Sequence, residues 1–427
     1  MSVEGRLREI VDGFERPFWI ANVSEIFERL SYYGAFASLA LYLQEKLNFS
    51  TQQTGTLTGL FGGMVWFLAI FGGAVADKIG FRRALSTAYL ILAASYFLIG
   101  SIGDSWLAPV RNAVPLALFV GVILMLPALG ISLVKPCVVG TTARASKDNV
   151  RQIGYSIYYT MVNIGSLAGP YIASWAHKHL GVEKVFRISA LSVFAMFFFV
   201  LFFFREPRKA SDAPPPSFAQ VAANFLKILW PPRFLIFLLI FTGYWIVYWQ
   251  QYTALPGFIT QYVNADKGLA ELILITDPLM VIFLTIAVNH VIRKMAPLRA
   301  VILGTVITSV SWLILAFWPT VPGTVAALAV LAVGEIIQQP PYYSYISKLA
   351  PPGQQGIYMG FAFLPLGLGS IFGGMLGGYL VHHYAEVLHR PERVWYCITA
   401  IGLATAVLLV VYDRAIKPAT EEAATST

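Results

Sequence analysis

The sequence predicts an all-α integral membrane protein with twelve transmembrane helices in two six-helix bundles. Of its 427 residues, 57% are apolar and only 12% are charged, and apolar runs recur along the whole length. A soluble domain needs about 25% charged residues to cover its surface. Each run approaches the roughly 20 residues that cross a bilayer core, without the alternation typical of a membrane β-barrel. Lipid is therefore the expected solvent for most side chains.

Twelve apolar runs define the expected spans, and a polar segment divides them into two sets of six. The spans are predicted at 18–44, 54–76, 83–102, 115–138, 153–176, 186–204, 235–262, 269–292, 299–318, 322–346, 356–382 and 394–412. We expect an N-terminal bundle at 1–204, a cytoplasmic linker at 205–233 and a C-terminal bundle with its tail at 234–427. The linker contains three consecutive prolines, which a helix interior does not tolerate, and then a short amphipathic stretch at 218–230 that is typical of an interfacial helix.

The distribution of basic residues predicts the orientation. With the N-terminus inside, most of the 30 Lys and Arg fall in cytoplasmic segments, which places both termini in the cytoplasm. This topology explains the net charge of +8 without a nucleic-acid partner. Residues 1–16 lack the apolar core of a cleavable signal peptide, so we expect the first span to act as the insertion signal. The expected location is the plasma membrane, as in the inner membrane of a bacterium.

The segment between spans 2 and 3 runs from Gly73 through Asp77 and Gly80 to Arg83. This pattern resembles the loop signature of the major facilitator superfamily. The glycines allow close helix approach and a sharp turn. Asp77 is expected to cap a helix or pair with an arginine, and Asp77 and Arg83 are the predicted gating residues on the cytoplasmic side.

Span 1 carries Glu25, Glu28 and Arg29 on the helix face that continues through Tyr32 and Phe36. A charge at mid-bilayer costs at least about 2.5–3.5 kcal/mol, so such residues are functional candidates. One arginine between two carboxylates leaves one negative charge in excess, which a proton can neutralise. We therefore predict a proton-coupling site here; a salt-bridged cluster that merely locks helices together is the alternative.

Three more ionisable residues interrupt apolar spans: Lys135 on span 4, Asp277 on span 8 and Glu335 on span 10. Lys135 precedes a proline, and we expect it either to pair with a span-1 carboxylate or to extend to the cytoplasmic surface. Glu335 stands before a double proline and is predicted to be a gate or a substrate contact, with helix packing as the alternative.

With these residues the chain resembles the proton-dependent oligopeptide transporter (POT) family of the major facilitator superfamily. The family's span-1 motif matches Glu25, Glu28, Arg29, Tyr32, Tyr33 and Gly34, with Leu30 in place of an aromatic residue; its span-5 motif matches Tyr158, Tyr159, Asn163 and Gly165–Leu167. Lys135-Pro136 and Glu335 match two further positions. The motifs cover most of the first half of the chain and little of the second.

The resemblance implies proton-coupled import of di- and tripeptides by alternating access. It implies that Glu25, Glu28 and Arg29 couple protons, that Arg29 and Lys135 bind the carboxylate of the substrate, and that Asn163 and Glu335 bind its amino end. The predicted substrate-binding residues are Arg29, Tyr32, Tyr33, Trp66, Lys135, Tyr159, Asn163, Trp249, Gln250, Asp277 and Glu335. No cofactor and no metal is expected, since the proton gradient drives transport, and one chain is expected to function as a monomer.

The chain also departs from the family. Phe36 stands where a second arginine is usual, and residues 243–252 lack the span-7 glutamate that pairs with it. The absence of both the arginine and the glutamate is consistent, because either residue alone would be a buried charge without a partner. Asp277 replaces an asparagine. A narrower, modified or non-peptide substrate is therefore an open alternative.

Other functions remain as alternatives. Gly165–Pro170 is similar to part of an antiporter signature and would suit a proton-coupled exporter of amphipathic compounds, although small residues four apart also simply allow close helix packing. A non-transporting membrane sensor is disfavoured by the short linker and tail. An enzyme is disfavoured because the six histidines lie mainly in loops without metal-ligand spacing.

Overall fold

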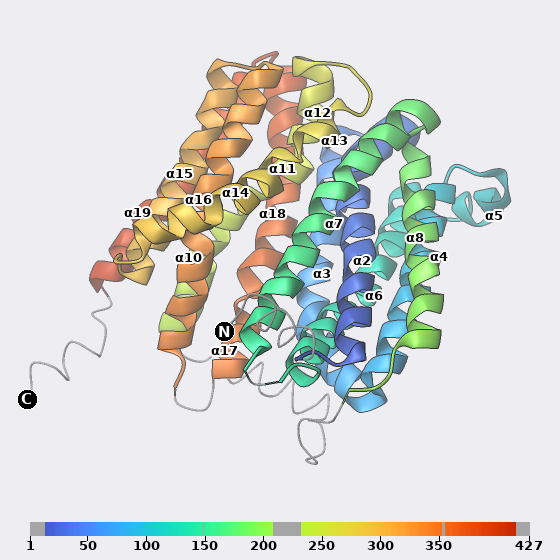
Figure 1. Ribbon diagram of the computed structural model, residues 1–427. Helices are drawn as coiled ribbons and strands as arrows, with labels where there is room; N and C mark the ends of the chain where they lie inside the picture. Colours follow the sequence, from blue (N-terminus) through green and yellow to red (C-terminus); the bar gives the residue numbers. More distant parts are fainter. Residues whose placement is uncertain (1–12, 148, 208–231, 352–354, 416–427) are drawn as a thin grey trace, which may run out of the picture.

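The computed structural model describes residues 13–147, 149–207, 232–351 and 355–415, and these are almost entirely helical (Figure 1). The first half contains α2 (Arg16–Leu41) with the turn η1 (Tyr42–Lys46), α3 (Thr51–Ile79), α4 (Phe81–Ser101), η2 (Ser105–Leu107), α5 (Ala108–Arg111), α6 (Leu116–Arg144), α7 (Arg151–Leu180) and α8 (Val182–Phe203). The second half contains α10 (Pro232–Tyr248), α11 (Gln250–Thr253), α12 (Leu255–Phe258), η3 (Ile259–Val263), α13 (Leu269–Ile273), α14 (Thr276–Ile292), α15 (Pro297–Phe317), α16 (Val321–Leu349), α17 (Gln355–Phe361), α18 (Leu364–Leu380), η4 (Val381–Val387) and α19 (Glu392–Ala415).

These helices form the twelve predicted membrane-crossing segments. Ten of the segments found in the described ranges are long and apolar enough to cross a membrane. The other two are α2 and α7, which have 26 and 30 residues but carry many of the polar side chains described below. The even number of crossings brings the start of α2 and the end of α19 to one end of the bundle, the lower end in Figure 1. We call this end the terminal face and the opposite end, with η1 and η4, the distal face.

The predicted interfacial helix at 218–230 lies outside the described residues, and α10 already begins at Pro232, inside the range expected for the linker. The loop signature between spans 2 and 3 is mostly helical rather than a loop. The only residue between α3 and α4 is Gly80, where the chain turns. Its φ of 86° is in the left-handed region that glycine adopts readily. Gly73, by contrast, is not needed for close approach, since an added Cβ would meet only Pro136 at 3.7 Å.

Glycine lets α2 and α7 pack backbone to backbone. A Cβ added at Gly169 would lie 2.4 Å from the Leu30 carbonyl oxygen, and one at Gly165 would lie 2.6 Å from Arg29 Cβ. The glycine pattern that resembles an antiporter signature therefore has a packing role here. This contact fixes the position of the charged segment of α2 against α7.

A second row of small residues joins the two halves of the protein along α3 and α18. A Cβ at Gly374 would lie 2.2 Å from the Gly55 carbonyl oxygen, and one at Gly59 would lie 2.7 Å from the Ser370 carbonyl oxygen. The glycine-rich run at 367–378 is thus the packing helix that the sequence predicts. The two halves approach as closely here as helix backbones allow.

We expect Gly374→Ala to lower the free energy of unfolding by about 1–3 kcal/mol, because overpacking a tight contact forces backbone shifts. The measurement is the thermal unfolding midpoint in detergent. Gly121→Ala on α6 is the control, since its Cβ would meet only Leu57 Cδ2, at 3.6 Å. It should leave stability unchanged or raise it slightly, because alanine favours helix. Equal midpoints for the two variants would contradict the close α3–α18 packing.

Candidate functional site

A cavity of about 310 Å³ lies between the two halves, and it collects most of the predicted site residues. The predicted residues that line it are Glu25, Arg29, Tyr32, Tyr33, Trp66, Lys135, Tyr159 and Asn163 from the first half and Trp249, Asp277 and Glu335 from the second. Among the predicted substrate-binding residues, Gln250 is the exception. Its amide nitrogen donates to the carbonyl oxygens of Ile246 and Gly373, at 2.7 and 2.9 Å, so it fixes α11 to α18 outside the cavity.

The predicted pairing in α2 is confirmed. Arg29 Nε donates a hydrogen bond to Glu28 and lies 3.4 Å from Glu25 Oε1. Both carboxylates are at most 1% exposed, and Glu28 lies behind Arg29 rather than in the cavity wall. Among the described residues, Arg29 Nη2 and Glu25 Oε2 have no hydrogen-bond partner. The arginine that lines the cavity therefore retains a donor for a further anion.

Lys135 binds aromatic rings instead of the carboxylate that the sequence suggests. Its Nζ lies 4.5 Å from the centroid of the Trp66 ring and 5.7 Å from that of Phe363. These two rings stack on each other and come from opposite halves of the protein. Within the described ranges Lys135 forms no ion pair. The carboxylates of α2 are engaged by Arg29, and the cation–π contacts keep the ammonium in the cavity instead of at the membrane surface.

Breaks in two spans of the second half place polar groups at the level of the cavity. One span breaks at Trp249, between α10 and α11, and the other breaks between α13 and α14. Asp277 lies in the first turn of α14, where the helix dipole favours a carboxylate. The hydroxyl of Tyr248, the last residue of α10, lies within hydrogen-bond distance of both Asp277 Oδ2, at 3.3 Å, and Glu335 Oε2, at 3.1 Å.

Several residues that line the cavity are not among the predicted site residues: Phe36, Tyr158, Tyr248, Tyr252, Gln339 and Tyr343. Gln339 and Tyr343 follow Glu335 at intervals of four, the spacing of one helix face. Gln339 Nε2 donates to Glu335 Oε1 at 2.9 Å. This spacing was a signal that could have identified both residues.

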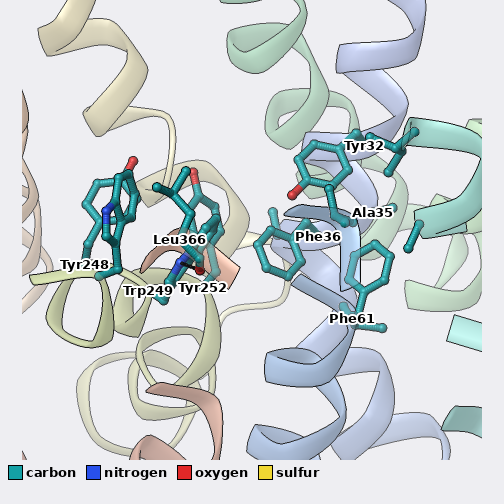
Figure 2. Close-up of a cluster of buried hydrophobic side chains, with 14 of the residues drawn as sticks. Tyr32, Ala35, Phe36, Phe61, Tyr248, Trp249, Tyr252 and Leu366 are labelled. Carbon is teal, nitrogen blue, oxygen red and sulfur yellow. Dashed lines mark hydrogen bonds between the residues drawn. The ribbon is translucent and has the colours of Figure 1, made fainter. Parts of the chain in front are cut away.

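Aromatic rings occupy the place where the family resemblance implies an ion pair between spans 1 and 7. Phe36 stacks on Tyr252 with ring centroids 5.0 Å apart, and it contacts Trp249 edge to face at 5.8 Å. Figure 2 shows Phe36 and Phe61 on one side of this cluster and Tyr248, Trp249 and Tyr252 on the other. Phe36 is 1% exposed. Because the cluster joins the halves without charge, a lone arginine could not replace Phe36 without cost.

The predicted gating residues lie at the terminal face. Arg144 Nη2 donates to Asp77 Oδ1 at 2.9 Å, which joins α6 to α3 within the first half. Glu206, not Asp77, accepts hydrogen bonds from the backbone N–H groups of Phe81 and Arg82 at the start of α4. Arg83 is exposed and forms no ion pair within the described part of the chain. The gating role of Asp77 and Arg83 stays a prediction.

A polar cluster that the sequence does not indicate joins the halves at the distal face. We call His177, Glu271, Glu45 and Ser38 the distal latch. His177 Nδ1 lies 2.8 Å from Glu271 Oε1, and its Nε2 lies 3.1 Å from Glu45 Oε2. Ser38 also donates to Glu271, at 2.9 Å. Carboxylates only accept, so both histidine contacts are hydrogen bonds when both ring nitrogens carry protons.

We expect His177→Gln to lower the free energy of unfolding by about 1–3 kcal/mol, because it removes a charge-assisted contact from the fully buried Glu271. Thermal unfolding in detergent measures the change. His179→Gln is the matched control, since His179 lies on the same helix turn and is exposed. If the two variants lose the same stability, the latch does not contribute as its geometry indicates.

We expect Phe36→Arg to destabilise the protein by about 2.5–3.5 kcal/mol or more, because it buries an unpaired charge. Adding Tyr252→Glu should restore part of the loss by supplying the partner. The check is a double-mutant cycle on the thermal midpoint, with Phe36→Leu as the uncharged control. Additive losses in the double variant would show that the two positions are not coupled.

Known proteins resemble the chain in sequence and in fold. Its sequence is 23% identical over 392 residues to multidrug resistance protein MdtH of Aeromonas salmonicida (strain A449), covering 92% of this chain and 94% of that protein. It is 25% identical over 389 residues to the uncharacterized MFS-type transporter YttB of Bacillus subtilis (strain 168), with 89% and 91% coverage. A crystal structure of a POT family transporter in complex with 5-aminolevulinic acid matches with a TM-score of 0.77 at 16% identity, covering 94% of this chain and 97% of that chain.

A peptide transporter POT in complex with sulfate matches with a TM-score of 0.72 at 19% identity, covering 95% of this chain and 96% of that chain. At these identities the structural matches show a shared fold. The family model of the Major Facilitator Superfamily matches residues 22–256 and 240–426, nearly the whole chain. The chain is a membrane transporter and belongs to the Major Facilitator Superfamily.

Proposed function

We propose that this transporter imports small zwitterions, short peptides among them, together with protons by alternating access. The observation that carries the proposal is the separation of charge across the cavity. Arg29 and Lys135 line the wall formed by the first half, and Asp277 and Glu335 line the wall formed by the second. A carboxylate and an ammonium at the two ends of one small molecule match these walls. The aromatic residues between them suit variable side chains.

Proton coupling is proposed for Glu25, Glu28 and Arg29. Two buried carboxylates flank one guanidinium, and this leaves an excess negative charge. A proton on either carboxylate removes that excess and weakens its hold on Arg29. The guanidinium can then bind the carboxylate of the substrate through its unpaired nitrogen. Substrate and proton would thus favour each other's binding, as symport requires.

Alternating access requires the two halves to separate at the distal face. In the structure the α3–α18 glycine contacts and the distal latch both join the halves there. We propose that both contacts open in the outward-facing state, while Asp77 and Arg83 contribute to closure at the terminal face. The proposed location is a bacterial plasma membrane with both termini in the cytoplasm. Because the cavity lies within one chain, a monomer would suffice.

A proton-coupled exporter of amphipathic compounds is the second candidate, and two observations favour it. Curated relatives are named multidrug resistance proteins. The Phe36–Tyr252 stack makes the cavity wall aromatic where the family resemblance implies charge. Ethidium movement against an imposed proton gradient would support the exporter, and dialanine uptake along it would support the symporter.

A non-peptide zwitterion is a further possible substrate of the symporter, since the Phe36–Tyr252 stack replaces the charges that the family resemblance implies. The solved relative with 5-aminolevulinic acid binds a small molecule of that kind.

We expect Glu28→Gln to abolish accumulation of dialanine in proteoliposomes with an inward proton gradient. The variant lacks one titratable carboxylate beside Arg29 but can still equilibrate substrate, so counterflow should persist. Radiolabelled dialanine measures both. Glu15→Gln, at an exposed position just before α2, is the control and should accumulate substrate like wild type. Accumulation by Glu28→Gln against a gradient would exclude Glu28 from coupling.

A further inference from the structure

Asp277, which is buried, and Glu335, which is half-buried, are two carboxylates with no cation beside them among the described residues. Asp277 is 4% exposed, and its Oδ1 has no hydrogen-bond partner among the described residues although the side chain lines the cavity. The ionisable neighbours of the pair are tyrosines, namely Tyr33, Tyr159, Tyr244, Tyr248, Tyr252 and Tyr343. The cations Arg29 and Lys135 line the opposite wall. Two negative charges in this position need a positive charge to remain buried.

The hydrogen bonds of Tyr248 show how that charge can be supplied. Its hydroxyl lies within hydrogen-bond distance of both carboxylates, at 3.3 and 3.1 Å. A phenol has one proton to donate, and an ionised carboxylate only accepts. Both contacts are therefore satisfied together only when one carboxyl carries a proton and donates it to the tyrosine oxygen. The geometry fits one proton shared along the chain carboxyl, phenol, carboxylate.

We propose that Asp277 and Glu335 share one proton through Tyr248 when no substrate is bound, and that a primary ammonium group of the substrate displaces this proton. The inference rests on the proposed zwitterion site. It assigns a proton to the acidic wall of that site, in addition to the proton proposed for Glu25 and Glu28. The exchange balances, since one ammonium enters as one proton leaves to solvent. Asp277 Oδ1, unpartnered and in the cavity wall, is a ready acceptor for the ammonium.

This exchange differs from the coupling proposed for α2. At the α2 site a proton and the substrate bind together, whereas at the Asp277–Glu335 pair they compete. Exchange at one position by itself drives opposite movements of proton and ammonium. Import with protons therefore requires Glu25 or Glu28 to hold a proton in the substrate-bound state.

The shared proton can be tested without any substrate, by infrared spectroscopy of the purified protein at pH 7. The spectrum of wild type minus that of Asp277→Asn should contain the carbonyl stretch of a protonated carboxylic acid. In the variant, Tyr248 can donate to Glu335 alone, and no shared proton is needed. Tyr248→Phe should shift the band, because the acid loses its acceptor. Asp266→Asn, at an exposed loop acid of the same half, should leave the band in place. Absence of the band from the difference spectrum overturns the proposal.

The exchange is tested by calorimetry with dialanine in two buffers of different ionisation enthalpy. Calorimetry measures the net proton exchange, which includes any uptake at the α2 site. The number of protons released per dialanine should therefore be about one greater for wild type than for Asp277→Asn. For wild type it should also be about one greater with dialanine than with N-acetyl-dialanine, which lacks the ammonium. Equal proton exchange by wild type and Asp277→Asn on binding dialanine overturns the exchange. Failure of dialanine to bind would refute the peptide assignment under "Proposed function", and the infrared band would then decide the shared proton by itself.

Discussion

Charges buried in the middle of an apolar bundle are the constraint on which the rest of this structure depends. Each must be paired, placed against aromatic rings, protonated or bound to a ligand, since lipid and aliphatic side chains offer no compensation. Three solutions occur around one cavity. Arg29 is held by carboxylates of its own helix, Lys135 by two aromatic rings, and the Asp277–Glu335 pair by a tyrosine hydroxyl. The glycine contacts of α2 with α7 fix the position of this charged segment against α7.

The aromatic cluster around Phe36 changes how the two halves are coupled. An ion pair across the cavity would bind substrate anions and would respond to protons. A stack of Phe36 on Tyr252 does neither, because it joins α2 to α11 by apolar burial and ring contacts alone. Charge recognition is thereby concentrated on Arg29 and Lys135 at one wall and on the acidic pair at the other. This division of charge between two walls is the arrangement that the proposed zwitterionic substrate requires.

The spans and most cavity residues can be predicted from the sequence because both signals are local. Apolar length identifies a membrane helix, and charges within it, such as Arg29 and Glu335, are conspicuous. Gln250 was misplaced with respect to the cavity because the helix breaks at Trp249, where the regular periodicity stops. The contact of His177 with Glu271 joins residues 94 positions apart across the two halves, so no local pattern could indicate it. The sequence predicts that Lys135 either pairs with a carboxylate or extends to the cytoplasmic surface. It does neither, because Arg29 engages both carboxylates on α2 and two aromatic rings hold the ammonium in the cavity.

The same hydrogen-bond arithmetic applies at the cavity and at the distal face. Tyr248 stands between two carboxylates that only accept, and so does the ring of His177. A neutral tyrosine or histidine has one proton to donate, and it faces two carboxylates. Both of its contacts are hydrogen bonds only when one further proton is bound. At the distal face that proton belongs to a contact between the halves, and at the cavity it belongs to the acidic wall of the proposed substrate site. In the proposed cycle, proton binding therefore contributes both to the contact that joins the halves and to the site that binds the substrate. The proposed function thus links closure and substrate binding through protons.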